Sequence, residues 1–161
     1  MPVHTPTLYV NMLGTANNYI KQKTEGLTHA DSMLQLPIPA NCMNWILGHI
    51  MVYREQYLGV IDGVTKPDED EFAIYGFGSE PLTDPDKAIP LETILARLDD
   101  LSDRVVAALE NMPESRLDEI YDEERGVTVD QRLHFYLVFH EAYHVGQLES
   151  LYELAIANGK N

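Results

Sequence analysis

The chain of 161 residues has a single cysteine, Cys42, and no apolar run long enough to cross a bilayer. One cysteine excludes an intramolecular disulfide framework, and a membrane-spanning helix needs about 20 mostly apolar residues. The first residues show neither the basic nor the apolar part of a secretory leader. We therefore expect a cytoplasmic protein without a membrane partner. We expect a single domain over residues 1–161, which is large enough to fold without a stabilising disulfide.

Basic residues are also scarce: 11 Lys and Arg stand against 26 Asp and Glu, which gives a net charge of −15. The imbalance is concentrated in residues 62–124, which hold 19 acidic and 5 basic residues. Nucleic-acid binding requires a basic patch against the phosphates, and no cluster of Lys and Arg offers one. We expect no nucleic-acid partner, and we interpret the acidic middle of the chain as solvated surface.

Apolar residues recur at helical spacing in four long segments, which predicts four amphipathic helices. Their expected ranges are about 5–24, 41–61, 90–110 and 128–157, with short helical pieces at 28–34 and 113–121. Residues 63–89 are rich in Gly and Pro and form a long connection. The prediction is an all-α protein, a four-helix bundle with a long crossover between the second and third helices, which can then run parallel.

Three histidines fall on the inward faces of these predicted helices. His140 and His144 are four residues apart, so their side chains lie one turn apart on the same face of a helix. His49 lies on the apolar stripe of the second long helix. Three neutral imidazoles can hold a divalent metal and leave a coordination position open, as in catalytic zinc sites. Cys42 is a further candidate ligand, although a lone cysteine is more often a buried apolar side chain.

The segment from His140 to His144 also reads as H-E-x-x-H, the signature of zinc proteases, in which the glutamate is a general base. No histidine follows His144, and the chain shows no alternating strand pattern, so a metalloprotease is disfavoured. Glu141 remains the candidate general base. It is turned about 100° from His140 around the helix, a position that also suits a contact with a neighbouring helix or with a ligand imidazole.

Two motifs resemble those of a known family. The run Asn44-Trp45-Ile46-Leu47-Gly48-His49, followed some ninety residues later by His140-x-x-x-His144-x-Gly146-Gln147, is similar to the DinB-like superfamily of four-helix bundles, which includes thiol-dependent transferases. The resemblance implies an up-down-down-up bundle and frequent homodimers. It also implies a site for a divalent metal, often nickel or zinc, with iron and manganese as further candidates. The implied ligands are His49, His140 and His144.

Two classes of function remain open from the sequence. The first is a metal-dependent thiol transferase or hydrolase acting on a small molecule, for which a low-molecular-weight thiol is one candidate. Tyr53, one turn beyond His49, and Gln147, close to the face of His144, are expected to line the open side of the metal. The second is a non-catalytic stress-response or binding bundle in which the metal is structural. His4, His29 and His134 have no partners in the pattern and are expected at the surface or in single hydrogen bonds.

Overall fold

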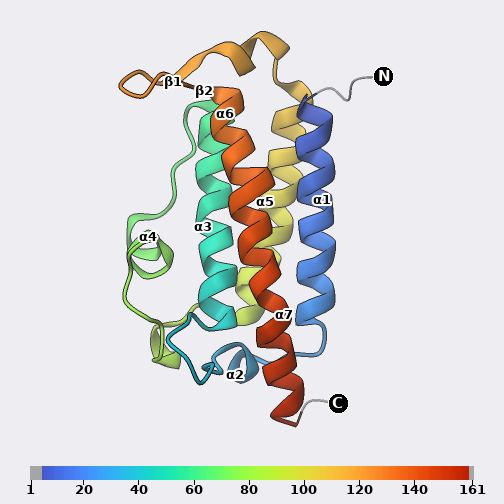
Figure 1. The fold of residues 1–161 in the computed structure, drawn as a ribbon, viewed down its shortest axis with the longest axis vertical. Coiled ribbons are helices and arrows are strands. Elements are labelled where there is room, and N and C mark those ends of the chain that lie inside the picture. The colour runs from blue at the N-terminus through green and yellow to red at the C-terminus, as the bar shows by residue number, and fades with distance from the viewer. Residues whose placement is uncertain (1–4, 160–161) are drawn as a thin grey trace.

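The structure is a computed structural model that describes residues 5–159. It is mostly helical, as predicted, and its long helices lie side by side (Figure 1). Three of these helices are α1 (Thr5–Thr24), α3 (Met43–Asp62) and α5 (Leu91–Asn111). The fourth, which we call the C-terminal rod, joins α6 (Val129–His134), the π-helical turn η3 (Phe135–His140) and α7 (Glu141–Ala157). The helices α3 and α1 each pack against both α5 and the C-terminal rod.

The helix ends follow from local signals. Thr128 caps the C-terminal rod, because its side chain accepts a hydrogen bond from the Gln131 amide while the Gln131 side chain accepts one from the Thr128 amide. Gly63 ends α3 with φ 74°, a conformation that favours glycine. Asparagine is a favoured N-cap residue, so the sequence predicts Asn41 as the cap of α3. The structure instead places Cys42 in that position, one residue later, where it makes no side-chain capping bond.

The short helix expected at 28–34 is present as α2 (His29–Ser32). The crossover contains more structure than the sequence predicted, because it holds α4 (Glu69–Tyr75) and the 3-10 turn η1 (Pro85–Lys87). The short helical piece expected at 113–121 is confirmed only in its first part. This segment forms the 3-10 turn η2 (Glu114–Asp118) and then β1 (Ile120–Asp122), which pairs antiparallel with β2 (Val127–Thr128). Strands this short cannot show an alternating pattern of apolar and polar residues, so the sequence did not predict the hairpin.

Ion pairs and hydrogen bonds attach the crossover to the bundle. Arg97 on α5 donates to Glu71 on α4 at 2.6 Å and to Glu55 on α3 at 2.9 Å. Trp45 Nε1 donates to the carbonyl oxygen of Ile74 at 3.1 Å and to Ser79 Oγ at 2.9 Å. Charged pairs of low exposure hold more firmly than pairs in full solvent. The crossover therefore has a defined position beside α3.

A buried ion pair separates two apolar clusters of the core. One cluster includes Ile20, Ile50, Leu98 and Leu148, and the other includes Leu13, Val60, Val105 and Leu133. Between them, Arg54 Nη2 donates to Glu141 Oε1 at 2.6 Å, and the two side chains are 0% and 1% exposed. Arg54 Nη1 also donates to Asn17 Oδ1 and to the carbonyl oxygen of Leu98. This one guanidinium thus connects α3 with α1, α5 and the C-terminal rod.

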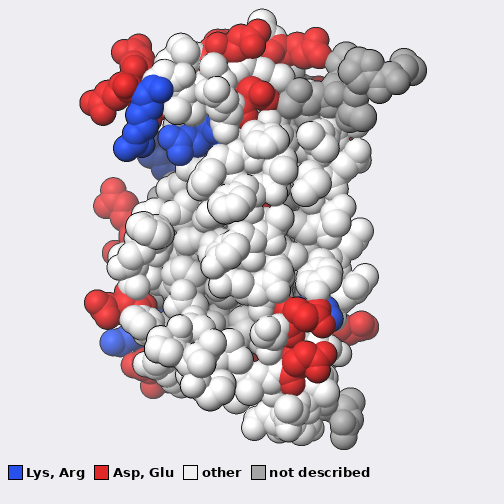
Figure 2. All heavy atoms as spheres, in the orientation of Figure 1, with Lys and Arg blue, Asp and Glu red and all other residues white. Residues whose placement is uncertain are grey.

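The outer surface is acidic at its margins and uncharged in the middle of one face. In Figure 2 the red side chains lie mainly around the edge of that face, and most of its basic side chains gather near the hairpin end of the bundle. Within residues 5–159, no helix combines the length and the apolarity needed to cross a bilayer.

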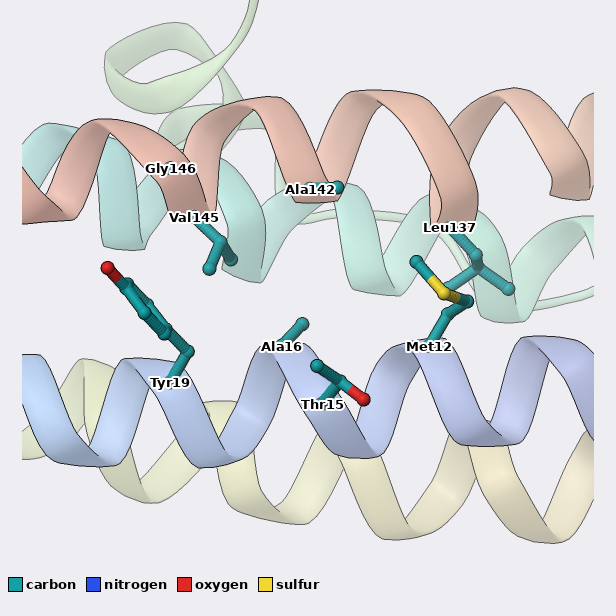
Figure 3. A pocket seen from close by; sticks show the side chains of 8 residues that line it. All are labelled: Met12, Thr15, Ala16, Tyr19, Leu137, Ala142, Val145 and Gly146. Carbon is teal, nitrogen blue, oxygen red and sulfur yellow. The ribbon is translucent and has the colours of Figure 1, made fainter.

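A shallow apolar groove of about 200 Å³ runs between α1 and the C-terminal rod. Figure 3 shows Met12, Ala16 and Tyr19 of α1 on one side and Leu137 and Val145 of the rod on the other. The small residues Ala142 and Gly146 lie on the rod side of the same groove. Because these side chains are small, space remains between the two helices where they face each other.

The buried ion pair generates a stability prediction. Glu141→Ala leaves the Arg54 charge buried without its carboxylate, so we expect the free energy of unfolding to fall by about 3–5 kcal/mol. The double variant Arg54→Met/Glu141→Leu removes both charges and should recover most of the loss. Chemical denaturation measures both, with exposed Glu153→Ala on α7 as the control. A loss below about 1 kcal/mol in Glu141→Ala would contradict the presence of a buried ion pair between Arg54 and Glu141.

Candidate metal centre

The structure brings His49, His140 and His144 together. His49 comes from α3, His140 is the last residue of the π-helical turn, and His144 lies one turn further along α7. His49 is 2% and His144 is 9% exposed, and His140 is partly buried. Each ring offers one nitrogen to a set of ligand atoms that all lie within 4.8 Å of one another. Among the residues described, this group could hold a metal ion.

The spacing of one pair of nitrogens is close to that of two ligands on a single cation. His49 Nε2 and His140 Nε2 are 3.1 Å apart. Two imidazole nitrogens on one tetrahedral zinc, each about 2.05 Å from the ion, are separated by about 3.3 Å. The ring centroids of His49 and His144 are 4.4 Å apart, and those of His140 and His144 are 4.7 Å apart. The three rings are therefore arranged around a common point rather than stacked in a row.

Hydrogen bonds on the opposite ring nitrogens orient two of the imidazoles. His49 Nδ1 lies 2.6 Å from the carbonyl oxygen of Tyr75, and His144 Nδ1 lies 2.8 Å from Gln147 Oε1. Both oxygens are acceptors, so each Nδ1 carries the proton and each Nε2 keeps its lone pair. His140 Nδ1 lies 3.4 Å from the Tyr57 hydroxyl. Partners of this kind fix the ring orientation in metal sites.

The pKa values of all three histidines favour the neutral form that a metal requires. Burial lowers the pKa of His49 to about 4, and burial together with the two neighbouring imidazoles lowers the pKa of His140 to about 3. Burial also lowers the pKa of His144. Each ring is therefore uncharged at neutral pH, and its free lone pair is available to a cation.

The histidines form one wall of a pocket of about 690 Å³ between α3, the crossover and the C-terminal rod. Tyr53 and Gln147, the two residues expected to line the open side, both lie in this wall. The Tyr53 ring packs 4.5 Å from His49 and 4.6 Å from His140. Trp45 stacks on His49 at 4.5 Å with an interplanar angle of 19°. A bound ion would therefore face a space large enough for a small molecule.

Glu141, the candidate general base, does not line this pocket. Its carboxylate is 1% exposed and is held by Arg54 in the core. From the sequence, Glu141 could be either a general base or a contact with a neighbouring helix. Its ion pair with Arg54 of α3 is a contact of the second kind. The base role of Glu141 stays a prediction that the geometry does not favour.

The other candidate residues lie apart from the three histidines. Cys42 Sγ lies 3.5 Å from the carbonyl oxygen of Leu82, and burial raises the pKa of this thiol, so it serves as a buried apolar side chain. His29 Nδ1 accepts the Leu91 amide at the start of α5. His134 is exposed on the C-terminal rod. His4 lies outside the residues that the structure describes.

Sequence reasoning missed the way in which the crossover positions His49. The Tyr75 ring is fully buried and packs against α3 at Gly48, where an added Cβ would come within 2.3 Å of a ring carbon. The Tyr75 hydroxyl donates to Asn44 Oδ1 at 2.9 Å and accepts the Ile89 amide at 2.8 Å. The glycine before His49 was the only sequence signal of this close approach.

Comparison with known proteins gives the family. The model of the DinB superfamily matches residues 24–148, and the chain belongs to this family. The fold is also similar to a crystal structure titled as a conserved protein of Enterococcus faecalis, with a TM-score of 0.74 and 16% identity over 97% of this chain and 99% of that one. At this identity the likeness concerns the fold alone. No curated protein matches the chain significantly.

Gly48 provides a test of the positioning of His49. Gly48→Ala forces the Tyr75 ring away from α3 and with it the carbonyl that holds His49 Nδ1, so we expect metal affinity to fall about 10- to 100-fold. Gly14→Ala on α1 is the matched control, because a Cβ there meets nothing within 4 Å. Titration with zinc under competition from a chelator measures both variants. Equal affinities of the two would exclude this role for Tyr75.

Proposed function

We propose that the protein is a metal-dependent enzyme of the thiol-transferase or hydrolase kind that acts on a small molecule. His49, His140 and His144 are the proposed ligands of a divalent ion, with nickel or zinc as the first candidates and iron or manganese after them. The observation that carries the proposal is the location of the three nitrogens in the wall of an open pocket. A purely structural zinc site has four protein ligands and no open position.

The chain's own residues orient the ligand rings and give the site an aromatic wall. The Tyr75 carbonyl and Gln147 hold two of the ligand rings, while Trp45 and Tyr53 cover His49 with aromatic surface. When bound, a divalent ion would lower the pKa of a coordinated water or small thiol. Gln147 also lines the pocket, so its amide is within the space where substrate would lie.

The finer topology belongs to the same proposal. We propose the up-down-down-up order that the resemblance implies. The crossover supports it, since it leaves α3 at the hairpin end of the bundle and enters α5 at the α2 end (Figure 1). We also propose a homodimer, for which the apolar groove between α1 and the C-terminal rod (Figure 3) is the candidate contact surface.

The enzymatic proposal is tested by activity. Zinc- or nickel-loaded protein should conjugate a low-molecular-weight thiol to an electrophile or hydrolyse a small ester or amide, and His140→Ala should abolish this turnover. His134→Ala, which removes an exposed histidine from the same rod, should retain it. A chromogenic thiol acceptor and a nitrophenyl ester provide the two assays. Metal-loaded protein that is inert in both, or a fully active His140→Ala variant, would contradict the proposal.

A second candidate is a non-catalytic bundle in which the metal joins α3 to the C-terminal rod. The observation that favours it is the origin of the ligands, because His49 and the other two histidines lie on different long helices. Free metal at about 100 times its dissociation constant should then raise the free energy of unfolding by about 2.7 kcal/mol. His49→Ala should show no such gain at the same concentration. Stabilisation without turnover in either assay would favour this candidate over the enzyme.

A further inference from the structure

The pocket beside the three histidines is walled mainly by aromatic rings. Several come from the C-terminal rod, and others come from α3 and from the loop after α4: Trp45, Tyr53, Phe77, Phe135, Phe139 and Tyr143. Its volume of about 690 Å³ lies in the ordinary range for small-molecule sites, which are lined by apolar and aromatic side chains with a few polar groups. The composition of this wall indicates a ligand with a large apolar part.

The rim of the pocket exposes aromatic surface to solvent. Phe135, Phe139 and Tyr143 follow one another at four-residue spacing on the C-terminal rod and are 45%, 61% and 57% exposed. Phe77, in the loop after α4, is 88% exposed. Exposed apolar groups gathered around a hollow are a feature of ligand grooves. A flat apolar ligand would cover these rings.

Charge in the pocket is opposite in sign to that of the whole protein. The chain carries 26 Asp and Glu, yet none of the described residues that line this pocket is acidic, and Arg132 is the one Lys or Arg among them. A cavity lined by one sign of charge attracts ligands of the other sign. Arg132 is thus the one charged side chain of the described lining, and its sign favours an anion.

The Arg132 side chain has N–H groups that make no hydrogen bond within the described chain. Its side chain is 22% exposed, and its Nε is buried and makes no hydrogen bond to any residue of the described chain, so the terminal Nη groups are the donors that a ligand can reach. The carboxylate paired with it, that of Asp122, is 3.7 Å away, beyond hydrogen-bond distance, and also pairs with Arg125 at 3.6 Å. The guanidinium lies over the Tyr136 ring at 5.6 Å. An arginine with unused N–H groups recognises carboxylates in a forked geometry.

Arg132 and the candidate metal ligands lie along one wall. Arg132, Tyr136, His140 and His144 recur every four residues on the C-terminal rod, so they share a face. Arg132 and His140 are eight positions apart, which corresponds to roughly 12 Å at the rise of an α-helix. The π-helical turn between them shortens this distance. A molecule with an aromatic ring and a short chain between its two ends spans a distance of this order.

We propose that Arg132 is the anion-recognition residue of this pocket and that the substrate is a small molecule combining an apolar, preferably aromatic, body with a carboxylate. Arg132 binds the carboxylate, the aromatic wall binds the body, and the reacting end lies beside His140. This deepens the proposed function and rests on it for the reaction. The binding preference itself depends only on Arg132 and the aromatic wall.

The test compares matched ligands by calorimetry. Phenylalkanoates from 3-phenylpropionate to 6-phenylhexanoate are titrated against the alcohols of equal length, with metal-free and with zinc-loaded protein. In both forms we expect the best carboxylate to bind at least about tenfold tighter than its alcohol, because a charged hydrogen-bonded pair is stronger than a neutral one. Arg132→Gln should remove that preference and leave the affinity for the alcohol within about twofold.

Two further variants keep the result interpretable. Arg125→Gln removes the other arginine that pairs with Asp122, outside the pocket lining, and should retain the preference for carboxylate. Arg132→Lys keeps the charge without the fork, and should retain part of the preference if Arg132→Gln folds poorly.

Equal binding of carboxylate and alcohol, or a preference that survives Arg132→Gln, would overturn the inference. A preference confined to the zinc-loaded form and insensitive to Arg132 would place the carboxylate on the metal and also refute it. Metal-free protein that discriminates through Arg132 but never binds zinc would sustain this inference while the proposed function fails.

Discussion

The candidate metal site depends on one constraint: three neutral imidazole nitrogens, from α3 and the C-terminal rod, face the same point. The two histidines of the C-terminal rod share a face by helix geometry alone. His49 has to be brought to them by the packing of α3 and turned correctly, and the Tyr75 carbonyl at 2.6 Å fixes its ring. The crossover therefore acts as more than a connection, because it supplies the acceptor that leaves His49 Nε2 free.

The buried Arg54–Glu141 pair contributes to the same convergence from inside the bundle. It joins α3 to the C-terminal rod, the two elements that carry the histidines. Burying two charges is costly in itself, and such pairs are better explained by the arrangement they specify than by the stability they add. Here the pair favours one register between the two elements. We infer that Glu141, although adjacent to His140 in sequence, serves the site by positioning its helix.

Local patterns predicted the long helices and the pair His140 and His144, since helical spacing is visible within a few turns of sequence. The meeting of His49 with that pair followed from assuming a bundle and from the resemblance to a known family. Contacts between distant segments could not be predicted from local sequence patterns. The partner of Glu141, the acceptor for His49 and the position of Arg132 at the pocket each depend on residues far away in the chain. The hairpin and the π-helical turn were missed because each is too short to impose a period. Gly48 was visible in the sequence only as part of a motif, and its close contact with Tyr75 became apparent only in the structure.

Anomalous diffraction from crystals of the protein grown with zinc, recorded on both sides of the zinc absorption edge, would locate the ion. We expect one strong peak about 2.0–2.1 Å from a nitrogen of each of His49, His140 and His144, with its remaining side facing the aromatic pocket. A peak held by other residues, or no peak at these histidines in crystals with zinc in excess, would contradict this expectation.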